Sequence, residues 1–139
     1  TVLGGWASPD KLPSLFHDAD VLVHAESFVP STVELVQYSL STKLSQYMMS
    51  GRCVLALGPK EVSSVRLPAE VGGGVAVHDQ DPQTIASAIR LHLLTAESRE
   101  KLATAGRNWS QSWVEQSRGH NRFRETISAF TKTIKTNID

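Results

Sequence analysis

A cluster of hydroxyl and basic side chains stands at the start of a short amphipathic segment near the middle of the chain. Residues 39–42 are rich in hydroxyl groups, which commonly satisfy the free N–H groups of a helix's first turn. Lys43 follows where the helix dipole is already positive, so a cation there is slightly unfavourable unless an anion lies nearby. Two interpretations stay open: a solvated lysine, or a site where hydroxyls, N–H groups and an ammonium bind phosphate.

The residues around this cluster predict half of a parallel α/β unit. Leu44, Tyr47 and Met48 recur at the spacing of one helix face, and Gly51 stands where a left-handed residue usually ends a helix. The apolar run 52–57 then predicts a buried strand, and Gly58 with the following proline predicts a turn whose backbone can approach a ligand.

A second group of polar residues follows the strand predicted at 21–24. Glu26 and Ser27 come just after its carboxyl end, where open parallel sheets bind ligands, although a solvated loop carboxylate explains Glu26 equally well. His24 ends the strand and is interpreted as a hydrogen-bonded structural residue before a catalytic one. No cysteine or second histidine stands near it at metal-ligand spacing, so we expect no metal site.

The remaining elements follow from local signals. We expect strands at 2–5 and 75–77, a loop or irregular helix at 29–38, a weak helix at 62–71 broken by Pro68, and a turn at 72–74. Residues 79–82 predict a helix start with Pro82 in its first position. After a short charged helix at 97–107, Trp109 and Trp113 are interpreted as anchors of a long helix that runs to about residue 135, with Phe123 and Ile127 facing inward.

Composition sets the broad class. The 139 residues suit one α/β domain (residues 1–139), and the alternation of strands and helices predicts a doubly wound parallel sheet with flanking helices and a long C-terminal helix. The 14 basic residues balance the 14 acidic ones, which gives no electrostatic case for nucleic acid. A single cysteine, Cys53, excludes an internal disulfide framework and is expected in the core. No apolar run is long enough for a membrane span, so a cytoplasmic location is the default expectation.

The order of these motifs resembles a known enzyme family. Residues 41–56, Ser-Thr-Lys-Leu-x-x-Tyr-Met-x-x-Gly-Arg-x-Val-Leu-Ala, with the Asp-Ala-Asp-Val-Leu-Val of residues 18–23, are similar to the donor-binding half of retaining GT-B glycosyltransferases of the group 1 (family 4) type. The resemblance extends from about Leu3 to the C-terminal helix. It implies that the chain is the C-terminal portion of such an enzyme, without the acceptor domain, and contributes strands three to six of a sheet ordered 3-2-1-4-5-6. The resemblance thus implies that the sheet of this chain is partial, Rossmann-like and made of about four strands.

The resemblance also implies an activity and a set of site residues. Such enzymes transfer a sugar from a nucleotide-sugar donor to a polysaccharide or small acceptor without a metal, and the isolated donor half is expected to be inactive. It assigns Ser41, Thr42 and Lys43 to the diphosphate and Gln46 to the ribose, and it places Glu26 or Tyr38 beside the transferred sugar. The family usually has glutamates at the positions of Tyr38 and Gln46, and a glutamine lacks the charge that makes such hydrogen bonds strong.

Two alternative functions and one structural expectation remain. Loss of the acidic pair is also compatible with a non-catalytic, glycosyltransferase-like scaffold or interaction domain, and a flavodoxin-like binding domain is a third reading. If strand 2–5 has no neighbour, we expect it to pair with the edge at 21–25 or with a second molecule, which would give an edge-paired dimer.

Overall fold

A three-stranded parallel sheet organises the part of the chain that the computed structural model describes, residues 5–114 and 123–128. Strands β1 (Val21–Ala25), β2 (Cys53–Leu57) and β3 (Gly74–Val77) lie side by side in that order. The register places Val21 opposite Cys53 and Val54 opposite Gly74. All residues of β2 except the last are buried, as expected for an apolar strand that is covered on both faces.

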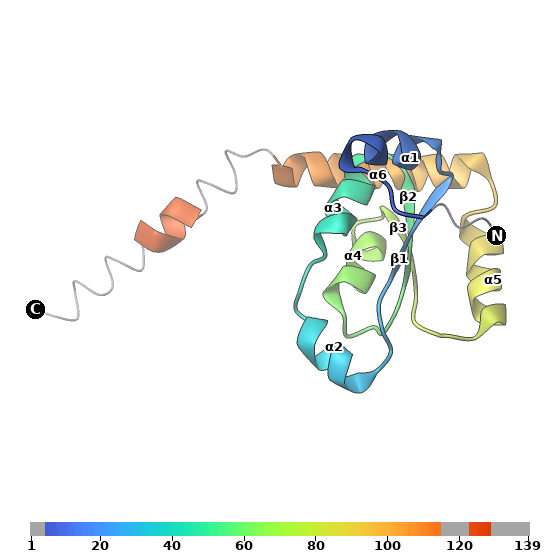
Figure 1. Cartoon of the computed structure of the whole chain (residues 1–139), viewed down its shortest axis with the longest axis horizontal. Helices are drawn as coiled ribbons and strands as arrows, with labels where there is room; N and C mark the ends of the chain where they lie inside the picture. The colour runs from blue at the N-terminus through green and yellow to red at the C-terminus, as the bar shows by residue number, and fades with distance from the viewer. Residues whose placement is uncertain (1–4, 115–122, 129–139) are drawn as a thin grey trace, which may run out of the picture.

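Helices cover both faces of the sheet (Figure 1). On one face, α3 (Thr42–Met49) packs Leu44 and Met48 against Val54. Helices α2 (Pro30–Val36) and α4 (Ser63–Glu70) cover Ala56 on the same face. On the other face, α5 (Pro82–His92) and the residue after it, Leu93, pack against Cys53, Leu55 and Val77.

Helix α6 (Ala96–Val114) crosses the end of the sheet at which the strands begin (Figure 1). Leu102 in its first half packs on the face covered by α5, whereas Trp109 in its second half packs beside Leu44 on the opposite face. Between them, Gly106 lies against Gly73, just before β3. A Cβ built on Gly73 would lie 2.6 Å from the Gly106 Cα atom, so two backbones are in direct contact there.

The chain before β1 forms a 3-10 turn, η1 (Pro9–Lys11), and the short helix α1 (Leu12–Asp18). Phe16 of α1 makes an edge-to-face contact with Tyr47 of α3, with ring centroids 5.2 Å apart. This contact holds α1 beside α3, on the side of the molecule away from α5 (Figure 1).

Several sequence predictions are confirmed. The helix that contains Leu44 and Met48 ends before Gly51, which has a left-handed φ of 71°. The buried strand predicted at 52–57 is present as Cys53–Leu57, and the helix predicted from Pro82 begins there. The turn predicted at 72–74 is also present but ends one residue earlier, because Gly74 begins β3. None of the helices within the described residues is long and apolar enough to cross a membrane.

Other predictions need correction. The described residues contain three strands where about four were expected; of the strand predicted at 2–5, residues 2–4 lie outside the described residues and Gly5 is not in a strand. Residues 29–38 contain a regular helix, α2, and α4 continues through Pro68.

The C-terminal region also differs from the prediction. One helix, α6, spans both the charged segment and the tryptophans, although Trp113 is largely exposed. The predicted extension to residue 135 falls partly outside the described residues. Within the helical segment 123–128, Phe123 and Ile127 are at least half exposed, so their predicted inward orientation is wrong.

Gly74→Ala tests the close packing of β3 on β2. A Cβ at this position would lie 2.2 Å from the carbonyl oxygen of Val54. Because that atom belongs to the backbone of a paired strand, we expect the free energy of unfolding to fall by about 3 kcal/mol. The matched control is Gly72→Ala, where the new Cβ would meet only Ala105 at 3.8 Å and the left-handed φ costs about 1 kcal/mol. Urea unfolding that shows an equal or larger loss for Gly72→Ala would contradict the packing argument.

The cap of α5 gives a pH prediction. The Asp81 carboxylate accepts hydrogen bonds from the Thr84 N–H group at 2.9 Å and the Thr84 hydroxyl at 3.0 Å. The backbone hydrogen bond, followed by the side-chain one, lowers the pKa of Asp81 from its ordinary 3.8. A carboxylate with a lowered folded-state pKa stabilises the protein above its unfolded pKa and loses that contribution as the pH falls through the folded value.

We therefore expect Asp81→Ala to melt at a lower temperature than the wild type at pH 7. The difference should shrink as the pH falls from about 3.8 through the lowered folded-state pKa of Asp81, because the wild-type carboxylate becomes protonated over that range. Asp81→Asn keeps a neutral acceptor and should differ from Asp81→Ala by a pH-independent amount. A wild-type advantage over Asp81→Ala that persists unchanged to acid pH would refute this account.

Candidate ligand-binding site

The carboxyl ends of the strands bring Glu26 and Gly58 together. The Glu26 N–H group donates to the Leu57 carbonyl at 2.9 Å, and the Gly58 N–H group donates to the Val77 carbonyl at 3.1 Å. A Cβ at Gly58 would lie 2.8 Å from a methyl of Val65 and 3.1 Å from the Cβ of Glu26. Position 58 therefore has no room for a side chain, and its backbone lies directly beside Glu26.

Ser27 has a local role. Its hydroxyl oxygen accepts a hydrogen bond from the Val29 N–H group at 3.1 Å, in the turn that leads into α2. The structure places Ser27 next to Glu26, as the sequence predicts. The hydroxyl, however, already stabilises the turn.

Sequence reasoning treated His24 and Glu26 separately, whereas the structure pairs them. His24 is only 6% exposed, and its Nε2 atom lies 3.1 Å from Oε1 of Glu26. The two atoms are within ion-pair distance but are not aligned for a hydrogen bond. The signal that could have predicted this contact is the i, i+2 spacing of His24 and Glu26, because alternate side chains of an extended segment lie on the same side. A buried imidazole thus faces a carboxylate at the carboxyl edge of the sheet.

The start of α3 is fixed to the start of α4. The hydroxyl of buried Ser64 accepts from the Ser41 N–H group and donates to the Ser39 carbonyl, both at 2.9 Å. The Ser63 hydroxyl donates to the Gln37 carbonyl at 2.8 Å. Since α4 begins five residues after Gly58, these bonds place the start of α3 at the carboxyl edge of the sheet.

The first turn of α3 is open to ligands. No side-chain hydrogen bond caps its N-terminus at Ser41, and Thr42, Lys43 and Gln46 are all exposed. Among the described residues, Lys43 forms no ion pair. Four predicted residues are therefore gathered on one helix end. The Ser41 N–H group is taken by Ser64 and the Leu44 N–H group by the Ser41 carbonyl, whereas those of Thr42 and Lys43 have no partner among the described residues.

Tyr38 and the apolar side of α3 complete this region. Tyr38 lies in the link between α2 and α3 and is 87% exposed. Within the described part of the chain, no hydrogen bond or ion pair joins Glu26 to the residues at the start of α3. Ser41 also lines an apolar groove of about 240 Å³ that continues along α3 to Trp109 and Trp113.

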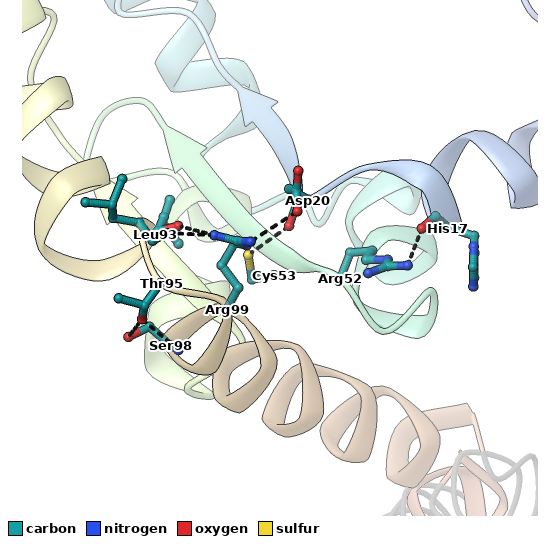
Figure 2. Close-up of polar contacts among 9 residues, drawn as sticks. His17, Asp20, Arg52, Cys53, Leu93, Thr95, Ser98 and Arg99 are labelled. Atoms are coloured by element: carbon teal, nitrogen blue, oxygen red, sulfur yellow. Dashed lines mark hydrogen bonds and ion pairs between the residues drawn. The ribbon is translucent and has the colours of Figure 1, made fainter.

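A second polar region lies at the opposite, amino edge of the sheet (Figure 2). Arg99 donates from Nη1 to the carbonyls of Leu93 and Leu94, each at 3.0 Å, and from Nη2 to Oδ1 of Asp20 at 3.2 Å. It therefore connects the end of α5 and the start of α6 to the residue before β1. Sequence reasoning missed this connection because its partners are far apart in the chain.

Cys53 lies under this region and behaves as a core residue. Its side chain is 1% exposed, and its thiol lies 3.5 Å from the Asp20 carbonyl. Burial raises the pKa of the Cys53 thiol, and the nearby charge of Arg99 opposes that shift only in part. A thiol with a raised pKa is a poor nucleophile at neutral pH, which agrees with the structural role predicted from the sequence.

Neither edge offers a recognisable metal centre. Within the described residues, no three His, Cys, Asp or Glu side chains are grouped so as to hold a metal ion. Comparisons with protein-family models, with curated proteins and with solved structures find no match. Any function assigned to this chain therefore rests on the residues at the carboxyl and amino edges of the sheet.

Arg99→Gln tests the connection at the amino edge. The substitution removes hydrogen bonds from a charged, mostly buried group to two helix-end carbonyls, so we expect a loss of about 1.5–3 kcal/mol in the free energy of unfolding. Asp20→Asn should cost no more than about 1 kcal/mol, since the Asp20 side chain is 82% exposed and exposed ion pairs contribute little. Chemical denaturation in which Asp20→Asn is as harmful as Arg99→Gln would show that the ion pair, not the carbonyl contacts, holds this edge.

Proposed function

We propose that this chain is the donor-binding half of a GT-B glycosyltransferase of the retaining, family 4 type. The enzyme would transfer a sugar from a nucleotide-sugar donor to a polysaccharide or small acceptor. The observation that carries the proposal is the uncapped first turn of α3 at the carboxyl edge of a parallel sheet, with Thr42 and Lys43 exposed and Ser41 half-buried beside them. The sequence resemblance to that family falls on the same residues.

The charges at this helix end suit a diphosphate. Free N–H groups and the positive end of the helix dipole favour anions. Lys43 adds a full charge, and Ser41 and Thr42 add hydroxyl donors. Such a set stabilises the negative charge that builds up on a leaving diphosphate, without requiring a metal ion.

Neighbouring residues suit the rest of the donor. Gln46 is one helical turn beyond Thr42 and is exposed, so its amide lies on the same face as the proposed diphosphate site and can bind a ribose diol. At Gly58 the backbone lies directly beside Glu26, so its carbonyl and the Glu26 carboxylate can contact the same part of the donor. Between the two residues assigned to the transferred sugar, the contact of Glu26 with buried His24 favours Glu26 over the exposed Tyr38.

Nucleotide titration of Lys43→Ala tests this proposal. We expect UDP or GDP, and the corresponding nucleotide sugars, to bind saturably in a calorimetric or NMR titration. Lys43→Ala should weaken binding by about 1.5–3 kcal/mol, the usual size of a charged hydrogen bond. Lys101→Ala is the matched control, because it removes an equally exposed lysine from α6.

The control also separates the alternatives. Equal weakening by Lys43→Ala and Lys101→Ala would reveal only non-specific attraction and would contradict the assigned site. Absence of saturable binding to a folded chain would favour the non-catalytic scaffold, in which the positions of Tyr38 and Gln46 have lost the family's acidic residues.

A further inference from the structure

A cavity of about 500 Å³ opens at the amino edge of the sheet, far along the strands from the start of α3. Three guanidinium groups line it, from Arg52 before β2 and from Arg99 and Arg107 on α6. The carboxylates that line it are those of Asp20 and Glu100. Its volume lies within the range of small-molecule sites, roughly 300–1,000 Å³.

Two of these arginines are held mainly by neutral groups. Arg52 donates from Nη2 to the His17 carbonyl, and Arg99 donates to the carbonyls of Leu93 and Leu94 (Figure 2). Carbonyl acceptors fix the direction of a guanidinium without neutralising it. The Asp20 carboxylate pairs with Arg99 but is largely exposed, so water screens that pair.

Arg107 makes no hydrogen bond or ion pair within the described residues. Its side chain lies over Gly51, where an added Cβ would be 3.5 Å from both Cδ and Nη1 of Arg107. The guanidinium of Arg107 is thus held beside the residue that precedes Arg52. Two arginines with no carboxylate partner among the described residues converge on one cavity from different elements.

We propose that this cavity binds a phosphorylated polyol of the sugar-phosphate class. Guanidinium groups match phosphate oxygens with paired N–H donors. Glu100, which makes no hydrogen bond within the described residues, and the outer oxygen of Asp20 supply acceptors for hydroxyl groups. The same two carboxylates disfavour ligands that carry only negative charge, so the cavity selects a ligand with both phosphate and hydroxyl groups.

The start of α6 does not provide the anion site by itself. Thr95 caps it, accepting from the Ser98 N–H group at 3.2 Å (Figure 2). The proposal also does not depend on the function proposed for the start of α3, because the two regions lie at opposite ends of the strands and share no residue.

The test is an NMR titration of the whole chain with glucose 1-phosphate and, separately, with inorganic phosphate at fixed ionic strength. We expect glucose 1-phosphate to shift the amide signals of Gly51, Arg52 and Thr104, and to leave those of residues 41–44 unchanged. Arg107→Gln should weaken binding by roughly tenfold to a hundredfold, and the fold should persist because Arg107 makes no hydrogen bond or ion pair to any residue that the structure describes. Arg90→Gln, on an exposed part of α5, is the matched control, and Lys43→Ala should have no effect.

Each outcome decides the proposal. Absence of binding would overturn it, and so would equal weakening by Arg90→Gln and Arg107→Gln. Shifts at residues 41–44 that Lys43→Ala abolishes would also overturn it and would support the nucleotide site at the start of α3 instead. Inorganic phosphate should bind at least several-fold more weakly than glucose 1-phosphate, and Glu100→Gln should reduce that preference. Equal affinity for the two ligands would overturn the assignment of a polyol.

Discussion

The burial of β2 on both faces is the constraint on which the rest of the structure depends. Cys53 and Leu55 must be covered from one side and Val54 and Ala56 from the other, so helices have to pack on both faces of the sheet. Because the strands are parallel, each connection must return along the sheet. That geometry gathers the starts of α3 and α4 at the carboxyl edge. It leaves the ends of α1, α3 and α5 at the amino edge, where α6 closes the sheet.

The two edges then acquire different chemistry from the same topology. At the carboxyl edge, helix starts present N–H groups, and the hydroxyl of Ser64 uses both of its hydrogen-bonding directions to hold two of these starts together. At the amino edge, helix ends present carbonyls. Arginines satisfy these carbonyls, and the same arginines line the cavity. A single sheet thus carries two separate polar regions, one built on helix dipoles and the other on side-chain charge.

Sequence reasoning succeeded where the signal is local. The apolar run of β2, the stop at Gly51 and the helix start at 79–82 each depend on a few adjacent residues, and each was predicted correctly. It failed where packing overrides propensity. Pro68 stays inside α4 although its missing N–H removes one helix hydrogen bond, because it is fully buried on the face of the helix that packs on the sheet. The cavity at the amino edge could not be predicted, since its lining comes from three distant segments and no periodicity connects His17, Arg52 and Arg107.

The contact between Gly73 and Gly106 has an evolutionary consequence. A Cβ on either residue would meet the backbone of the other, at 2.6 Å from the Gly106 Cα atom or 3.1 Å from the Gly73 Cα atom. At most core contacts both residues can be substituted during evolution, because a larger side chain on one partner is offset by a smaller side chain on the other. Gly73 and Gly106 have no side chain, so neither can be replaced by a smaller residue. A substitution at one glycine therefore has no compensating substitution at the other, and the crossing of α6 over the sheet can change only if the whole helix moves.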